Sequence, residues 1–132
     1  MTNNVLVIDD NEDVRTLIQL ALEAEGFHVA VAANGHEGMG LLREKMAEVV
    51  VTDILMPEQD GIETIAELRR DFPDVKIIAI SGALSATGFD YLRVPIQLGV
   101  ARILRKPFDI QELVGAIREL VLTMDKPDSS KQ

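Results

Sequence analysis

The chain has 132 residues, 47% of them hydrophobic, which is enough for one domain with a core and too few for two. Its 13 basic and 22 acidic side chains give a net charge of −9, which disfavours direct binding to the phosphate backbone of nucleic acids. It has no cysteine, no apolar run of the ~20 residues that a membrane span needs, and no signal-peptide pattern at its start. We therefore expect a cytoplasmic protein that binds neither a membrane nor nucleic acid directly.

Five short apolar segments alternate with longer segments of helical period. The predicted strands are Asn4–Ile8, His28–Ala32, Val49–Thr52, Lys76–Ile80 and Arg102–Arg105. Three of them contain continuous apolar runs, which is typical of strands buried on both faces in a parallel sheet covered by helices. The last strand is bracketed by arginines and is predicted at an edge of the sheet. The alternation itself predicts an α/β fold with right-handed crossovers.

The predicted helices carry start and stop signals. The first helix has an apolar stripe and ends at Gly26. Three later helices begin with a capping residue followed by glutamate three positions on: Asn34 with Glu37, Asp60 with Glu63, and Asp109 with Glu112. The last helix has the clearest amphipathic stripe: Ile110, Leu113, Val114, Ile117, Leu120 and Val121.

Two segments are less regular than the rest. The predicted fourth helix, about residues 86–98, contains Gly88 and Pro95, and proline breaks or kinks a helix. The polar segment 125–132 is predicted to be a disordered tail, which leaves residues 1–124 as the domain. The glycines of Gly35–Gly40 follow the order G-x-x-G-x-G, which is wrong for a dinucleotide-binding loop, so we expect small packing residues at a helix start.

Polar residues stand at the carboxyl ends of four predicted strands. Asp9 and Asp10 follow the first strand, Asp53 the third, Ser81 the fourth and Lys106 the fifth. In a parallel sheet these ends lie along one edge, where open α/β folds bind their ligands, so the side chains should converge. Three carboxylates at one edge would raise each other's pKa values. A divalent cation with few protein oxygen ligands, the pattern that Mg²⁺ favours, relieves that repulsion.

The remaining two side chains suit a phosphoryl group. Lys106 supplies a positive charge for a phosphate oxygen, and Ser81 supplies a hydroxyl donor. A carboxylate such as that of Asp53 can attack phosphorus and form an acyl phosphate, while the cations neutralise the transferring oxygens. The sequence therefore predicts a site for a tetrahedral, multiply charged group.

Four motifs carry a resemblance to a known family: Asp9-Asp10, the segment 53–61 (Asp-Ile-Leu-Met-Pro-Glu-Gln-Asp-Gly), Ser81-Gly82-Ala83, and Lys106-Pro107-Phe108. Together they resemble the receiver domain of two-component response regulators over about residues 4–123. The resemblance implies a doubly wound, flavodoxin-like fold. Its five-stranded parallel sheet would have the order 2-1-3-4-5, with five flanking helices.

The resemblance also implies a role for each site residue. Asp53 would accept a phosphoryl group from a sensor histidine kinase or a phosphotransfer protein. Asp9 and Asp10 would hold Mg²⁺ together with Asp53, with Asp10 as the direct ligand of the acidic pair, and the backbone carbonyl of Leu55 would be a further ligand. Ser81 would be the switch hydroxyl and Lys106 the partner of the phosphate. Phosphorylation would then change a protein-binding face, expected at the fourth helix, fifth strand and fifth helix.

The sequence departs from the family pattern at three places. Ile103 stands where a tyrosine or phenylalanine is usual, so the family's aromatic swing is unavailable here. The segment between Ser81 and Lys106 is longer than typical, and Gln59 replaces an apolar residue. How this chain switches therefore stays open.

The sequence disfavours two rival functions. Aspartyl-phosphate phosphohydrolases carry a second aspartate two positions after the nucleophile, where this chain has Leu55. We therefore expect a signalling domain that catalyses its own phosphorylation and dephosphorylation, not an enzyme for external substrates. A degenerate receiver that only binds partners is disfavoured by the complete site. The cognate kinase, the downstream partner and the oligomeric state stay open. So does the choice between a stand-alone regulator, towards which the start at Met1 leans, and part of a longer protein.

Overall fold

The computed structural model describes residues 3–54, 61–81, 99–106 and 108–125. Five parallel strands form one sheet in the order β2-β1-β3-β4-β5, as the resemblance implied. The strands are β1 (Asn4–Ile8), β2 (His28–Ala32), β3 (Val49–Asp53), β4 (Lys76–Ser81) and β5 (Arg102–Arg105). The predicted bounds of β1, β2 and β5 are confirmed, and β5 lies at an edge.

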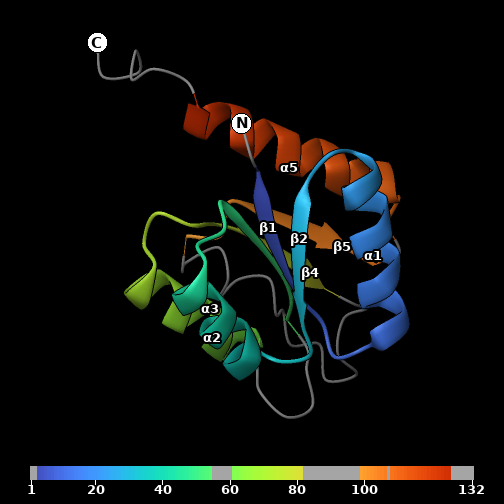
Figure 1. The fold of residues 1–132 in the computed structure, drawn as a ribbon. Helices are drawn as coiled ribbons and strands as arrows, with labels where there is room; N and C mark the ends of the chain where they lie inside the picture. The colour runs from blue at the N-terminus through green and yellow to red at the C-terminus, as the bar shows by residue number, and fades with distance from the viewer. Residues whose placement is uncertain (1–2, 55–60, 82–98, 107, 126–132) are drawn as a thin grey trace.

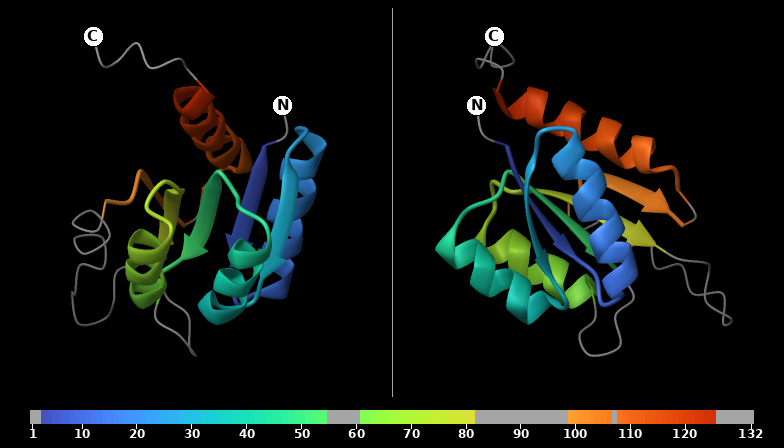
Figure 2. Two further views of the ribbon diagram at one scale, coloured as in Figure 1. Left: turned by 60° about the vertical axis from the view of Figure 1, so that its left-hand side comes forward. Right: turned by 45° about the vertical axis from the view of Figure 1, so that its right-hand side comes forward.

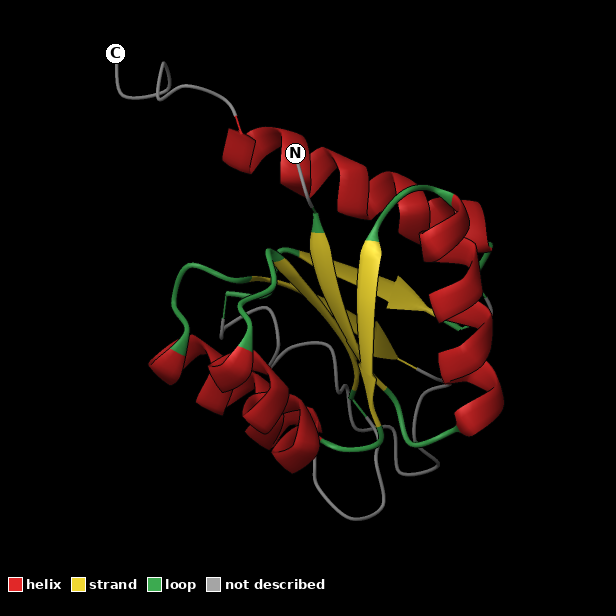
Figure 3. Cartoon of the chain, in the orientation of Figure 1, coloured by secondary structure: helices red, strands yellow, loops and turns green. Residues whose placement is uncertain are grey.

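Helices cover both faces of the sheet. They are α1 (Glu12–Ala24), α2 (Gly35–Glu44), α3 (Gly61–Asp71) and α5 (Ile110–Asp125). Figures 1 and 2 show α1 and α5 on one side of the sheet and α2 and α3 on the other, and Figure 3 shows the strands between these two helical layers. The predicted fourth helix and nearly all of the predicted tail lie outside the described residues. None of the described helices combines the length and the apolar character that a membrane crossing requires.

The continuous apolar runs are explained by two separate cores. In β1, Val5 and Val7 pack with α1 and α5, whereas Leu6 and Ile8 pack with α2 and α3. Successive side chains of a strand point to opposite faces, so a strand with a core on each side needs apolar residues at every position. All four of these side chains are at most 2% exposed. The two cores hold the carboxyl ends of the strands rigidly in place.

The predicted signals at two helix ends are confirmed in detail. Gly26 has a φ of 95°, and the amides of Gly26 and Phe27 donate to the carbonyls of Glu23 and Leu22. This pair of bonds closes α1 with a Schellman motif, which needs the left-handed backbone that glycine adopts most easily. At the start of α2, the Asn34 side chain accepts from the amide of Glu37.

Gly38 explains the small residues at the start of α2. A Cβ at this position would lie 2.6 Å from Cδ1 and 2.9 Å from Cγ1 of Ile8. The absence of a side chain lets α2 approach β1 closely, as the packing interpretation of Gly35–Gly40 predicted. Gly40, one half-turn further on, has nothing within 4 Å of such a Cβ.

Candidate functional site at the carboxyl edge of the sheet

The predicted acidic residues lie together where β1 and β3 end. Asp9 and Asp10 follow the last residue of β1, and Asp53 is itself the last residue of β3. One carboxylate oxygen from each of the three lies within 4.8 Å of the others. Asp9 and Asp53 are buried, and Asp10 is exposed. The convergence predicted from the parallel topology is therefore present.

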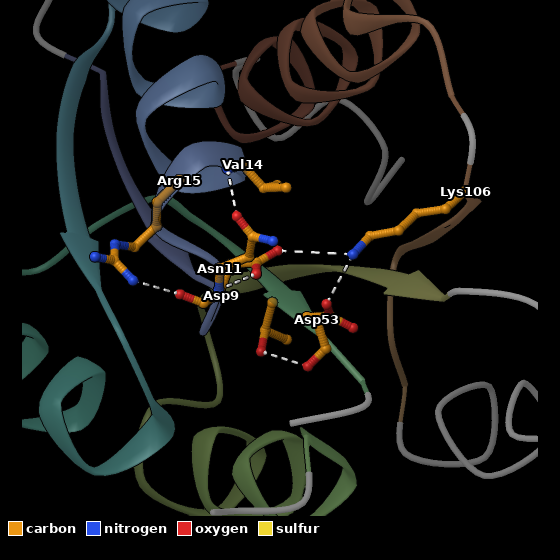
Figure 4. A network of polar contacts seen from close by, with 7 residues as sticks. Asp9, Asn11, Val14, Arg15, Asp53 and Lys106 are labelled. Carbon is orange, nitrogen blue, oxygen red and sulfur yellow. Dashed lines mark hydrogen bonds and ion pairs between the residues drawn. The ribbon is translucent and has the colours of Figure 1, made fainter. Parts of the chain in front are cut away.

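Lys106 reaches this acidic cluster from the end of β5. Its Nζ donates to Oδ2 of Asp53 at 2.9 Å and lies 3.9 Å from Oδ2 of Asp9, the second distance being too long for a hydrogen bond (Figure 4). Burial lowers the pKa of Lys106, but the hydrogen bond to Asp53 and the neighbouring carboxylates outweigh it, so the pKa lies above its ordinary value. The ammonium group is therefore charged at neutral pH.

The carboxylate of Asp9 is only partly paired. Its Oδ1 accepts from the amide of Asn11 at 2.9 Å, but its Oδ2 is buried without a hydrogen-bond partner. Burial raises the pKa of Asp9, and the charges of Asp53 and Asp10 raise it further, against lowering by the Asn11 amide and Lys106. A buried carboxylate oxygen with no donor, beside two more carboxylates, is the environment that a hard divalent cation would stabilise.

The backbone around the cluster is held by several bonds. Ser81 ends β4 and is 5% exposed, and its carbonyl accepts from the amide of Lys106 at 2.7 Å. The hydroxyl of Thr52 donates to the carbonyl of Asp53 at 3.2 Å. The strands β3 and β4 run one residue further than predicted, through Asp53 and Ser81, because these two pair with Ile80 and Arg105 in the sheet.

The structure thus places all the predicted site residues that it describes at the carboxyl ends of the adjacent strands β1, β3, β4 and β5. Leu55 lies outside the described residues, so its carbonyl stays a prediction. Two residues that sequence reasoning did not select also belong to this edge. Asn11 caps α1 by accepting from the amide of Val14 at 3.0 Å, and Arg15 donates from Nη1 to the carbonyl of Asp9 at 2.9 Å. An asparagine before two acidic residues is a helix-start signal that would have revealed Asn11.

Fold and site together define a doubly wound α/β protein with an acidic, lysine-containing site at the carboxyl edge of its sheet. The family model described as "response regulator receiver domain" matches residues 5–118. The chain belongs to this family.

Two curated relatives differ in how much of their own length matches this chain. The response regulator receiver protein CpdR of Brucella abortus is 33% identical over 118 residues, which are 89% of this chain and 96% of that protein. The transcriptional regulatory protein CpxR of Klebsiella pneumoniae is 34% identical over 120 residues, which are 90% of this chain but 49% of that protein. The chain thus spans about half the length of the transcriptional regulators that it matches.

Solved structures agree with the fold. A response regulator receiver domain protein from Clostridium thermocellum has a TM-score of 0.83 at 28% identity, covering 92% of this chain and 96% of that one. A receiver domain protein from Methanospirillum hungatei has a TM-score of 0.86 at 23% identity, covering 96% of this chain and all of that one. The second likeness shows the fold alone.

Proposed function

We propose that this receiver domain is the phosphoacceptor of a two-component phosphorelay, and that Asp53 takes the phosphoryl group. The observation that carries the proposal is the position of the Asp53 carboxylate, which lies within a cluster of three carboxylates and accepts a 2.9 Å hydrogen bond from Lys106. The site thus combines a nucleophile with a cation that can pair with phosphate oxygens. The phosphodonor would be a sensor histidine kinase or a phosphotransfer protein.

The chemistry follows from the groups present. An oxygen of the Asp53 carboxylate attacks phosphorus, and the bond between phosphorus and the donor's imidazole nitrogen breaks, with its electron pair leaving on nitrogen. The product is a mixed anhydride of the Asp53 carboxyl and phosphate. Before phosphorylation, Lys106 is hydrogen-bonded to the Asp53 carboxylate, so its Nζ is close enough to pair with an oxygen of the incoming phosphoryl group. Hydrolysis by water would return the free carboxylate and release inorganic phosphate, so the domain would catalyse its own dephosphorylation.

The cluster fits Mg²⁺ because Asp9 presents a buried oxygen that has no hydrogen-bond partner, next to the carboxylates of Asp10 and Asp53. These three residues would hold the ion, with the carbonyl of Leu55 as the further ligand that the family resemblance implies. When bound, Mg²⁺ supplies positive charge to the oxygens of the transferring phosphoryl group.

The docking surface for a protein donor would include α1, which begins directly after the acidic pair. Leu17 and Leu20 lie on this helix and are 62% and 61% exposed. A donor whose histidine reaches Asp53 must cover the edge of the sheet beside α1. Burial of the two leucines would then contribute about 1.5–3 kcal/mol each at most to docking. The downstream partner surface stays a separate expectation, because the segment 82–98 lies outside the described residues.

The test is covalent labelling with a small acyl-phosphate donor and Mg²⁺, read by intact mass. The wild-type protein should gain one phosphoryl group that is released by mild base, as an acyl phosphate is. Asp53→Asn should gain none, because an amide is a poor nucleophile. Asp13→Asn, which removes an exposed carboxylate from the first turn of α1, is the matched control and should label normally. Labelling of Asp53→Asn at the wild-type level would overturn the assignment.

A further inference from the structure

Arg15 connects α1 to the loop that carries the acidic pair. Its guanidinium reaches back along the helix, and Nη1 donates to the backbone carbonyl of Asp9 at 2.9 Å. Figure 4 shows Arg15 approaching Asp9 from the side opposite to Lys106. The two cations therefore act on different parts of the same residue, Lys106 near the carboxylate and Arg15 at the main chain.

This contact completes a small network around the loop. The amide of Asn11 donates to Oδ1 of Asp9, the side chain of Asn11 accepts from the amide of Val14, and the amide of Arg15 donates to the carbonyl of Asn11. The carboxylate and the carbonyl of Asp9 are thus both fixed against the first turns of α1. Because the Asn11 amide donates to Oδ1 of Asp9, the other oxygen, Oδ2, which has no hydrogen-bond partner, is turned towards Asp53 and Lys106.

We propose that Arg15 is a positioning residue for the cation site: by holding the carbonyl of Asp9, it fixes the direction of the Asp9 and Asp10 carboxylates. This inference rests on the proposed function, because it assigns Arg15 a role towards the Mg²⁺ that Asp9, Asp10 and Asp53 would hold. Groups that orient metal ligands from outside the coordination shell commonly change metal affinity on the order of 10- to 100-fold when they are removed.

Arg15 acts through its hydrogen bond and not through its charge. The contact that the structure shows is the 2.9 Å bond from Nη1 to the backbone carbonyl of Asp9. A long-range charge effect would also be screened at high ionic strength, whereas the geometry of a short hydrogen bond is not. The two mechanisms therefore predict different responses to salt.

The experiment compares Arg15→Met, Arg15→Lys and Arg43→Met in the full chain. Arg43→Met makes the same change in net charge from the exposed last turn of α2, on the opposite face of the sheet. Mg²⁺ affinity is measured by NMR titration at low salt and at high salt. Hydrogen exchange of the Asn11 amide is measured without Mg²⁺. Because this amide donates to Asp9, its exchange rate shows how firmly the loop is held in the absence of metal.

Arg15→Met should weaken Mg²⁺ binding on the order of tenfold at both salt concentrations and should speed exchange of the Asn11 amide. Arg43→Met should change neither. Arg15→Lys keeps a hydrogen-bond donor on a slightly shorter side chain and should recover part of the Mg²⁺ affinity. If Arg15→Met does not fold, the comparison is made with Arg15→Lys instead. In phosphorylation by an acyl phosphate, Arg15→Met should shift the Mg²⁺ midpoint while the rate at saturating Mg²⁺ stays near that of the wild type.

The inference is overturned if Arg15→Met and Arg43→Met bind Mg²⁺ with equal affinity, or if the loss in Arg15→Met disappears at high salt. In either case a wild-type protein that binds Mg²⁺ and labels at Asp53 leaves the proposed function standing. A wild-type protein that does neither overturns both.

Discussion

Replacement of Asp9 by asparagine should stabilise the metal-free protein. Two like unit charges at most 4.8 Å apart, as in Asp9 and Asp53, repel by at least about 3.5 kcal/mol at an effective dielectric constant of about 20. Two opposite charges 3.9 Å apart, as in Asp9 and Lys106, attract by about 4 kcal/mol. The repulsion by Asp53 and the attraction by Lys106 are therefore of similar size, and the exposed Asp10 adds a smaller repulsion. What remains is the cost of the buried Oδ2 without a hydrogen-bond partner, on the order of 1–3 kcal/mol.

Asparagine keeps the acceptor for the Asn11 amide and removes the buried charge. We expect Asp9→Asn to raise the free energy of unfolding by about 1.5 kcal/mol at pH 7 without divalent cations, or the midpoint of thermal unfolding by roughly 5 °C. Mg²⁺ should reverse the order, because a ligand at 100 times its dissociation constant stabilises the wild type by about 2.7 kcal/mol and the variant by less.

The pH dependence provides an independent check. Because the pKa of Asp9 is raised in the folded protein, the folded state binds more protons than the unfolded state between the ordinary value of 3.8 and the raised pKa. The free energy of unfolding of the wild type therefore falls as the pH rises through this window and stays lower above it. Asp9→Asn lacks this fall, so the two proteins should converge below pH 3.8 and separate towards pH 7.

The assay is urea unfolding in a chelator, followed by far-UV circular dichroism because the chain has no tryptophan. Asp74→Asn removes one carboxylate from an exposed loop position and should stay within about 0.5 kcal/mol of the wild type. If Asp9→Asn is no more stable than the wild type at pH 7 in chelator, or if the difference does not shrink at low pH, the reasoning about the buried Oδ2 is wrong.

Three further results are expected. Gly38→Ala should destabilise the protein by about 1–2 kcal/mol because its Cβ would collide with Ile8, whereas Gly40→Ala should stabilise it by about 0.5–1 kcal/mol; changes of equal sign in urea unfolding would contradict the packing argument. Lys106→Met should slow phosphorylation yet tighten Mg²⁺ binding up to about tenfold, since the competing charge-assisted bond to Asp53 is worth about 1.5 kcal/mol; weaker binding of Mg²⁺ in a titration would refute this. Leu17→Glu should slow phosphotransfer from a cognate histidine kinase by about tenfold and leave labelling by a small acyl phosphate unchanged. Leu122→Glu, with 63% exposure near the far end of α5, should affect neither, and equal losses in the two variants would remove α1 from the docking surface.

The fold could be predicted from the sequence because the apolar pattern of each strand indicates which of its faces are buried. Both-face burial makes β1 and β3 continuous apolar runs, and the parallel topology then places Asp9, Asp53 and Lys106 at one edge without any knowledge of distances. The predicted strands end one residue before the observed ends of β3 and β4, because Asp53 and Ser81 are polar although they are paired in the sheet. A polar residue at a strand end carries no signal that separates the strand from the loop that follows.

The contacts of long side chains could not be predicted from the sequence in the same way. The bond from Arg15 to the carbonyl of Asp9 depends on one rotamer of a long side chain and on a main-chain atom, which no residue pattern encodes. The same limit applies to the switch. Ile103 packs, half-buried, against the core between the sheet and the α2–α3 layer, in register with Ala79. Its branched Cβ restricts χ1 rotation, and the route of the signal stays a prediction.

The distribution of buried polar groups gives a physical reason to regard the acidic edge as the functional part of the molecule. Five polar or charged residues are buried in the described part of the chain, and four of them, Asp9, Thr52, Asp53 and Ser81, lie at the carboxyl ends of β1, β3 and β4. Elsewhere the two cores are filled with apolar side chains that agree with the strand and helix patterns. A folded protein tolerates buried, poorly paired polar groups where function requires them, because the packing of cores of this size offsets a loss of a few kcal/mol in the free energy of unfolding. If Asp9→Asn is more stable without a cation but binds Mg²⁺ poorly, then the carboxylate at this position lowers the stability of the free domain and is favourable only when the site is filled.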